Sequence, residues 1–447
     1  MRVAIIGAGI SGLATAYYLR QAKPDWEIRL FEKDDQVGGK VRSSQEKGFV
    51  FDWGPNGFLT NVDDTLDLAK NLGLADQLQV ASDHARHRLL YKQGRLFDLP
   101  ASPPKLLKTG LLNPYAKFRA LAELSLGKAS YTEESVYDFM ARHFGKGVAE
   151  TFAGPAVLGI TAGDAKELSL DALFPRFRKL EHEHGSLIRA MMAAQQQAKA
   201  SSRSSRLTSF NATGVQALST ALRDALLPCI RTAQELKLVS LEQGEYWLEF
   251  ADGSVYTADK LILATPTFVM ARLLTDLAPV AAAELGSIPY ADVVVIGLGY
   301  DRIDVPQPLD AFGFLVARGE AVRSLGVLYS SSIFPDQAES DKVMLRVICG
   351  GSLDPEFIGL SDIEMLEVVR HDLSIAMGIT AKPEFQQIVR WPRGIPQYTL
   401  GHGKKVAQIM HEIKSLSGLH LVGNAFYGVG VNDAVRDARR VVAELTT

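Results

Sequence analysis

The chain has 447 residues, of which 47% are hydrophobic and 22% are charged, and its formal net charge is −3. This composition is typical of a globular protein with a large core, and 48 Lys and Arg against 51 Asp and Glu give no basic excess that would indicate nucleic-acid binding. The two cysteines, Cys229 and Cys349, lie in hydrophobic stretches without metal-ligand spacing, so we interpret them as small buried side chains.

The amino-terminal sequence enters a strand pattern at Arg2 and leads directly into a glycine turn, so we expect no cleavable leader peptide. No apolar run reaches the roughly 18 residues that a membrane span requires. We therefore expect a cytoplasmic protein, and peripheral contact with the inner face of the membrane stays open.

Residues 3–21, "VAIIGAGISGLATAYYLRQ", predict a buried strand, a tight turn and a helix. Gly7, Gly9 and Gly12 have the G-x-G-x-x-G spacing in that context. The first glycine permits the turn, the second lets backbone approach a pyrophosphate, and the third lets the helix pack closely on the strand. Glycines also occur in ordinary turns, so the motif needs support from elsewhere.

That support comes from Glu32, which ends the next predicted strand twenty residues after Gly12, where an acidic side chain can accept hydrogen bonds from ribose hydroxyls. Its charge would repel a 2′-phosphate, which argues against NADP. Gly38 and Gly39 offer a second stretch of open backbone, and Arg42 offers a guanidinium for phosphate. A surface turn is the alternative interpretation of this glycine pair.

Residues 80–205 are predicted to be mainly helical, with a capping box at Thr132. Residues 103–127 combine apolar side chains with four basic ones, which favours a solvated helical face over a core; an anionic membrane surface is the alternative. Residues 193–206 are of low complexity and predict a connector. His182 and His184 are two apart without a third ligand, so we interpret them as helix surface and expect no metal site.

Further strands follow between residues 236 and 263, and the last of them ends at Ala264, where we expect the chain to pass beneath the dinucleotide. Residues 271–394 mix strands and helices. Residues 419–445 then repeat the strand, glycine-rich turn and helix of the amino terminus. A helix whose amino end points at a ligand places partial positive charge there. A terminal strand–helix unit without a ligand is the alternative.

Four segments carry a resemblance to a known family. "FDWGPNGFLTN" (residues 51–61) resembles a flavin fingerprint of the amine oxidase and protoporphyrinogen oxidase superfamily. Residues 154–175, 390–402 and 423–442 are similar to signatures of protoporphyrinogen oxidases, with departures at Ala165 and Ala434. The resemblance implies FAD as the cofactor. In that case the carboxy-terminal helix would favour electron uptake by the flavin.

The resemblance also implies roles for particular residues. The expected cofactor contacts are Gly7, Gly9, Ser11, Gly12, Glu32, Gly38, Gly39, Arg42, Gly54, Pro55, Asn56, Val239, Ala264, Trp391, Gly423, Asn424, Gly428, Val429, Gly430 and Val431. The expected substrate contacts are Arg88, Gly159, Phe312, Leu315 and Ile348. Asn56 and Gly159 are also the expected catalytic positions, beside the flavin and the pyrrole N–H groups. Core packing is the alternative for Phe312, Leu315 and Ile348, and a turn is the alternative for Asn56.

The family implies oxidation of a porphyrinogen to a porphyrin in heme biosynthesis, by six electrons in three hydride steps with dioxygen as acceptor and hydrogen peroxide as product. Protoporphyrinogen IX is favoured over coproporphyrinogen III, because the matched stretches offer one arginine for substrate carboxylates. Another flavin amine oxidase or desaturase is an open alternative. Amine oxidases usually carry a Gly-Glu pair where this chain has Gly423-Asn424. A flavin-free binding protein similar to Rab GDP-dissociation inhibitors is the non-enzyme alternative.

The predicted fold class is α/β, with a discontinuous Rossmann-like FAD-binding domain built from residues 1–80, 206–270 and 395–447. An inserted, mainly helical domain is expected at residues 81–205, facing the substrate or a membrane. An inserted, mixed α+β substrate-binding domain is expected at residues 271–394. A homodimer is left open.

Overall fold

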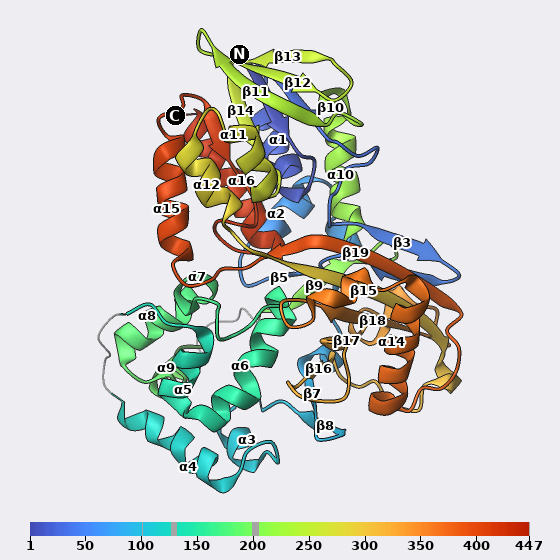
Figure 1. Ribbon diagram of the computed structural model, residues 1–447. Coiled ribbons are helices and arrows are strands. Elements are labelled where there is room, and N and C mark those ends of the chain that lie inside the picture. Colours follow the sequence, from blue (N-terminus) through green and yellow to red (C-terminus); the bar gives the residue numbers. More distant parts are fainter. Residues whose placement is uncertain (101, 127–131, 199–204, 447) are drawn as a thin grey trace.

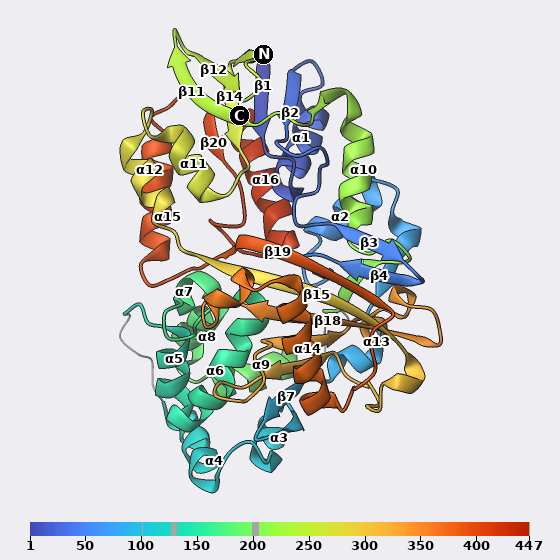
Figure 2. The same ribbon diagram turned by 45° about the vertical axis from the view of Figure 1, so that its right-hand side comes forward.

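The computed structural model describes residues 1–100, 102–126, 132–198 and 205–446. Figure 1 shows an upper part that holds both ends of the chain, and a lower part with a sheet on one side and helices on the other. Two long strands, β15 (Tyr290–Asp301) and β19 (Phe385–Pro396), run across the molecule where the two parts meet (Figure 2).

The upper part is built on a five-stranded parallel sheet in the order β10-β2-β1-β14-β20. Its strands are β1 (Arg2–Ile6), β2 (Glu27–Phe31), β10 (Ile230–Arg231), β14 (Lys260–Leu263) and β20 (Leu419–Leu421). They are short apolar runs because both faces of the sheet are covered. Three distant portions of the chain therefore form one sheet, which confirms that the two ends fold together.

One face of this sheet packs on α1 (Ile10–Ala22), α2 (Asp64–Asn71), α10 (Gln216–Leu226) and α16 (Val431–Thr446). The opposite face packs on a meander and three helices: β11 (Leu236–Glu242), β12 (Glu245–Phe250), β13 (Val255–Ala258), α11 (Thr267–Leu274), α12 (Pro279–Gly286) and α15 (His402–Ile413). Helix α1 lies against α16, so the two helices that follow the glycine-rich turns are neighbours.

The lower sheet has seven strands in the order β19-β15-β18-β17-β16-β7-β8. Besides β15 and β19, its strands are β18 (Lys342–Gly350), β17 (Gly326–Tyr329), β16 (Gly313–Val316), β7 (Leu89–Lys92) and β8 (Arg95–Asp98). One face packs on α14 (Asp362–Met377), which begins with a capping box at Ser361 and ends at the left-handed Gly378. The other face is turned toward α6 (Lys146–Thr161) and the nucleotide part.

A hairpin of β3 (Ser43–Glu46) and β4 (Phe49–Asp52) covers one end of that inner face. A Cβ on Gly297 would lie 2.7 Å from the ring of Phe51, and a Cβ on Gly299 would lie 2.6 Å from the ring of Phe49. These two glycines of β15 are therefore needed for the aromatic rings to pack flat against the strand. The chain that follows the hairpin enters a small sheet of three strands: β5 (Phe58–Leu59), β9 (Leu207–Phe210) and β6 (Leu78–Val80).

The helical portion comprises α3 (Pro103–Lys108), α4 (Pro114–Leu121), α5 (Val136–Phe144), α6, α7 (Leu170–Leu173), α8 (Pro175–His184) and α9 (Leu187–Ala198). A buried imidazole ties these helices together. The ring nitrogens of His143 lie 2.9 Å from Glu123 Oε1 and 3.1 Å from Glu181 Oε1. None of the described helices combines the length and the apolar character that a membrane span requires.

Several local predictions were wrong. Residues 89–98 do not belong to the helical portion, because β7 pairs in parallel with β16 and extends the lower sheet. The cap of α5 is Ser135, whose Oγ accepts the N–H of Asp138 at 3.0 Å, and not Thr132. Residues 193–198 continue α9 instead of forming a connector, while residues 199–204 lie outside the described residues.

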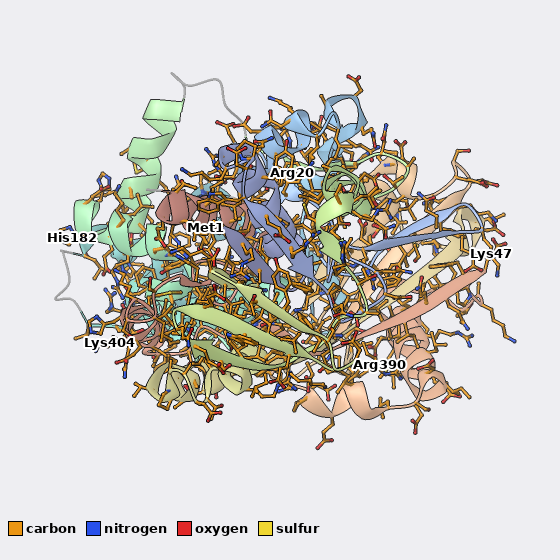
Figure 3. All side chains as sticks on the ribbon, turned by 90° about the horizontal axis from the view of Figure 1, so that it is seen from above. Met1, Arg20, Lys47, His182, Arg390 and Lys404 are labelled. Carbon is orange, nitrogen blue, oxygen red and sulfur yellow. The ribbon has the colours of Figure 1, made fainter. Side chains whose placement is uncertain are left out.

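Two further expectations concern single side chains. Cys349 is buried as expected, but Cys229 is partly exposed because it ends a short surface turn before β10. His182 is exposed on α8 at the periphery of the molecule, as Figure 3 shows, which fits its interpretation as helix surface.

Candidate functional site

The amino-terminal turn joins β1 to α1 in the tight form that its glycines predict. Gly7 has φ +100°, and a Cβ on Gly12 would lie 1.9 Å from the carbonyl oxygen of Gly7. By contrast, a Cβ on Gly9 would meet no atom within 4 Å. Helix α1 has no side-chain cap and no acidic residue in its first turn. Its free N–H groups and its dipole are therefore available to an anion.

Glu32 lies directly beside this turn at the end of β2. Its carboxylate is buried and accepts the N–H of Ala8 at 2.7 Å and the N–H of Asp34 at 3.1 Å. These two bonds fix the side chain against the turn and leave lone pairs for further donors. The position suits a carboxylate that binds ribose hydroxyls beside a pyrophosphate.

The second glycine pair closes over the first turn. The N–H of Gly38 donates to the carbonyl of Ala8 at 2.8 Å, and a Cβ on Gly39 would lie 3.2 Å from the Cα of Gly9. The structure thus brings the two glycine motifs together. Arg42 is turned into its own loop, where its Nε donates to the Val37 carbonyl at 3.3 Å.

The middle and carboxy-terminal segments reach the same edge of the sheet. A Cβ on Gly7 would lie 2.9 Å from the carbonyl oxygen of Ala264, which places the end of β14 against the first turn. The N–H of Val422 donates to the carbonyl of Leu263 at 3.0 Å. Gly423 follows at once, with open space where a Cβ would point. Backbone therefore converges on this edge from β1, β14 and β20.

A buried tyrosine fixes the carboxy-terminal turn. The hydroxyl of Tyr398 donates to the carbonyl of Asn424 at 2.6 Å and accepts the N–H of Gly428 at 2.9 Å. Its ring stacks on that of His402 at 4.0 Å. Burial lowers the pKa of His402 to about 4, so the imidazole is neutral near pH 7.

The amino end of α16 differs from our expectation. Asp433 folds back so that its Oδ2 accepts the N–H of Gly430 at 3.2 Å. Burial raises the pKa of this carboxyl, while the bond from Gly430 and nearby Arg436 oppose the shift. A carboxylate at this position partly offsets the positive end of the helix dipole. The expected contribution of α16 to electron uptake is correspondingly smaller.

The loop of residues 53–57 connects the nucleotide part with the lower sheet. The indole N–H of Trp391 donates to the carbonyl of Trp53 at 2.8 Å, and Arg346 donates to the carbonyl of Gly54. A Cβ on Gly54 would lie 2.3 Å from the carbonyl oxygen of Lys40. Pro55 and Asn56 occupy the middle of this tightly held loop, and Asn56 is partly buried.

Two of the three expected apolar substrate contacts, Leu315 and Ile348, lie in one row across the lower sheet, whereas Phe312 precedes β16 and packs in a separate cluster with Ile333 and Phe334. Leu315 on β16 is opposite Gly326 on β17, which is opposite Ile348 on β18. Directly opposed residues of neighbouring strands share a face, so Leu315 and Ile348 point the same way. The methyl carbons of Leu315 lie 3.6 Å from the position of a Cβ on Gly159 of α6. The row therefore faces α6.

Arg88 lies directly before β7, two residues before Leu90, which is paired with Leu315. Its guanidinium is 5.0 Å from the ring centre of Phe312, whose N–H donates to the carbonyl of His87 at 2.7 Å. The side chain is exposed overall, yet burial against the ring lowers its pKa. No described carboxylate forms an ion pair with it, so the cation is available to an anionic ligand.

The remaining expected contacts are less well placed for side-chain binding. Val239 of β11 is buried in the core beneath the meander, so only its backbone could reach a ligand. Ser11 lies in the first turn of α1, Val431 is the first residue of α16, and Val429 lies two residues before it. Two cations that sequence reasoning missed, Lys40 and Arg346, flank Gly54. Arg346 had a signal, because it is the only charge within the apolar stretch "VMLRVIC".

A parallel sheet with a tight, uncapped glycine turn and a buried acidic residue beside it is typical of Rossmann-type dinucleotide-binding proteins. The sequence profile described as flavin containing amine oxidoreductase matches residues 10–446. The chain belongs to this family of flavin-dependent oxidoreductases.

The chain is similar over its full length to named relatives. It is 28% identical to the coproporphyrinogen III oxidase of Bacillus subtilis (strain 168), covering 100% of this chain and 98% of the relative. It is 30% identical to the chloroplastic protoporphyrinogen oxidase of Nicotiana tabacum, and the match covers 99% of this chain and 85% of that relative. A crystal structure from Exiguobacterium sp. 255-15, provisionally named a protoporphyrinogen oxidase, has a TM-score of 0.87 at 25% identity. The match covers 100% of this chain and 98% of that chain.

These comparisons confirm the resemblance to protoporphyrinogen oxidases and the prediction of an FAD-dependent oxidoreductase with a mixed α/β fold. The non-enzyme alternative is set aside. The open backbone at Gly9 and Gly423, the buried Glu32 and the uncapped α1 fit the phosphates and ribose of FAD.

Proposed function

We propose that this protein oxidises a porphyrinogen to a porphyrin in heme biosynthesis, with FAD as the immediate electron acceptor. One observation carries the proposal: Leu315 on β16 and Ile348 on β18 share the inner face of the lower sheet, Leu315 lies close to Gly159 of α6, and the loop of residues 53–57 is bonded to the same sheet through Trp391 and Arg346. The full-length similarity to proteins named protoporphyrinogen and coproporphyrinogen III oxidase supports it.

Bound FAD supplies a hydride acceptor. The protein's task is to orient a flat apolar macrocycle against it, so no nucleophile or acid–base pair is required. Leu315 and Ile348 would contact the ring faces, and the carbonyl of Gly159 would accept pyrrole N–H bonds. Three two-electron steps remove six electrons, and with dioxygen as terminal acceptor they yield three molecules of hydrogen peroxide.

The cofactor assignments follow the same logic. Gly9, Gly38 and the start of α1 would hold the pyrophosphate, and Glu32 would hold the adenosine ribose. The loop at Gly54–Asn56 and the turn at Gly423–Gly430 would flank the flavin ring. We propose the three-part division of the chain with one change, which is that residues 89–98 belong with the substrate sheet.

Protoporphyrinogen IX is the proposed substrate, because Arg88 is an exposed cation near the apolar row that pairs with no described carboxylate. Coproporphyrinogen III, with four propionates, is the second candidate. The full-length similarity to the Bacillus subtilis relative favours it.

The deciding experiment supplies each porphyrinogen aerobically to the FAD-loaded protein and follows porphyrin fluorescence. Faster oxidation of protoporphyrinogen IX is expected. The reverse order would replace the substrate, and no oxidation of either would remove the proposal.

Arg88→Ala should raise KM by about ten- to a hundredfold, since a charge-assisted hydrogen bond to a propionate is lost. The matched control is Arg86→Ala, two residues away, where the side chain pairs with Asp83 on the surface. An unchanged KM in the Arg88 variant would place the propionate elsewhere.

We also propose that α4 touches a membrane surface. Tyr115 and Phe118 are 77% and 73% exposed, while Ala116 and Ala120 of the same helix face the core. Exposed aromatic side chains among Lys117 and Arg119 suit an anionic bilayer. Co-sedimentation with vesicles containing anionic lipid should be lost in the Tyr115→Ser, Phe118→Ser variant; equal sedimentation of both proteins would refute the contact.

A further inference from the structure

Arg346 is a buried charge on the substrate face of the lower sheet. It lies on β18 between Met344 and Ile348, and only 6% of it is exposed. Its neighbours on β15 and β17 are Gly297 and Leu328. Because alternate residues of a strand share a face, Arg346 points the same way as Ile348. A cation therefore lies next to the apolar row, two residues before Ile348 on the same strand.

The guanidinium has few partners for such a buried group. It donates one bond to the carbonyl of Gly54, and its Nε has no partner in the described part of the chain. Among the described carboxylates, none forms an ion pair with it. Asp52 attracts it from a longer distance, but that carboxylate is occupied by Ser43, Val215 and Gln337. Arginine is rarely buried without compensation, which points to a partner outside the chain.

Gly54 connects this cation to the expected flavin site. The loop of residues 53–57 is held on the sheet side by Trp391 and Arg346, and its Gly54 lies against the backbone of Lys40 next to the second glycine pair. A loop fixed at both sides presents its backbone in one conformation. Arg346 is the only one of these anchors whose bond to the loop also brings a full positive charge.

The charge of Arg346 matters more for the positive potential at the expected flavin site because the carboxy-terminal turn supplies only part of it. The dipole of α16 is partly offset by Asp433, so the helix supplies less positive potential than its position suggests. Burial lowers the pKa of Arg346 to about 10, which still leaves it protonated near neutral pH. A fixed cation in a low-dielectric region stabilises negative charge that develops nearby.

We propose that Arg346 is a positioning residue that holds the Gly54–Asn56 loop against FAD and favours reduction of the cofactor through its charge. The proposal rests on FAD binding, which family membership supports, and not on the identity of the substrate.

The test compares Arg346→Met, which removes the charge at similar length, with Arg346→Lys, which retains it. Arg302→Met is the matched control, since Arg302 caps a surface turn after β15 with bonds to its own loop. The measurements are the midpoint potential of bound FAD by anaerobic dye-coupled titration, its visible spectrum, and the dissociation constant of FAD. No porphyrinogen is needed, so failure of the proposed activity would not affect the result.

In Arg346→Met the affinity for reduced FAD relative to oxidised FAD should fall about tenfold, which is about 30 mV for a two-electron couple. The Lys variant should retain most of the wild-type potential, and the Arg302 variant should retain all of it. If the Met variant does not fold or does not load FAD, Arg346→Gln is compared with Arg346→Lys, and a lower potential in the Gln variant supports the proposal. A wild-type potential in a loaded Met or Gln variant would overturn it, as would loss of FAD that Lys fails to restore.

Discussion

The two glycine-rich turns lead into neighbouring helices at one edge of a parallel sheet, yet they are built differently. The turn before α1 is packed by glycines against backbone and leaves the helix end without a carboxylate. The turn before α16 is tied by the side chain of Tyr398, and Asp433 accepts the N–H of Gly430. The first suits phosphate, whereas the second suits an uncharged ring. On the proposed cofactor assignment, the same strand–turn–helix pattern would serve two parts of one cofactor.

The largest expected effect tests the packing of the first turn. Gly12→Ala places a Cβ 1.9 Å from the Gly7 carbonyl oxygen, where only backbone movement could relieve the clash. We expect the free energy of unfolding of the apoprotein to fall by about 3 kcal/mol or more, at the upper end for overpacking. Urea denaturation measures it. A wild-type midpoint would show that the turn is not close-packed.

The second prediction concerns the side-chain tie of the other turn. Because His402 has a folded pKa of about 4 and an ordinary value of 6.5, the unfolded chain binds the extra proton between these pH values. The contribution of His402 to the free energy of unfolding is therefore fully present above pH 6.5. It is lost as the pH falls toward 4, and the loss is about 3 kcal/mol at most. His402→Leu should remove this share of the pH dependence, and His182→Leu, at an exposed site, should not. Identical slopes in all three proteins would contradict the assignment.

Gly9→Ala separates folding from binding at the first turn. Gly9 has φ −73°, which alanine adopts readily, and its Cβ would enter open space. Apoprotein stability should stay unchanged while the dissociation constant of FAD rises about ten- to a hundredfold, or about 1.4–2.8 kcal/mol. Titration of the apoprotein with FAD, followed by flavin fluorescence, gives this value. Wild-type affinity would move the pyrophosphate away from Gly9.

The smallest expected effect tests whether the charge of Asp433 offsets the dipole of α16. Asp433→Asn removes the charge but keeps an oxygen that can cap Gly430. The affinity for reduced relative to oxidised FAD should rise about two- to fivefold, the share expected for one charge at a helix end. The direction is opposite to that expected for Arg346→Met. A lower potential in the Asn variant would mean that Asp433 does not oppose the dipole.

The sequence predicted the first turn well because its geometry is local. The spacing of Gly7, Gly9 and Gly12 alone requires a tight turn and a close helix. It also predicted that the carboxy-terminal segment joins the same sheet, since the strand–turn–helix pattern recurs there. Capping was harder, because Thr132 and Ser135 both fit the residue preference and the backbone conformation selects Ser135.

Contacts between distant segments could not be predicted in this way. The pairing of β7 with β16 joins residues more than two hundred positions apart, and the strand pattern of residues 89–98 carries no information about its partner. The fold of Asp433 onto Gly430 depends on φ +138° at Gly428, where a Cβ would lie 2.4 Å from the carboxyl carbon. Arg346 was visible as one charge in an apolar strand, but its bond to Gly54 required the assembled sheet.

The parallel sheet of the upper part also constrains how the molecule is made. Its edge strand β20 begins 413 positions after β1 ends. During translation, the parallel sheet that contains β1 can therefore be completed only after nearly the whole chain has been made. Such late closure gives a high contact order and prolongs the exposure of apolar surface to chaperones. Cofactor capture should accordingly be among the last events of biogenesis, and a chain shortened before residue 419 should accumulate as an insoluble, colourless product.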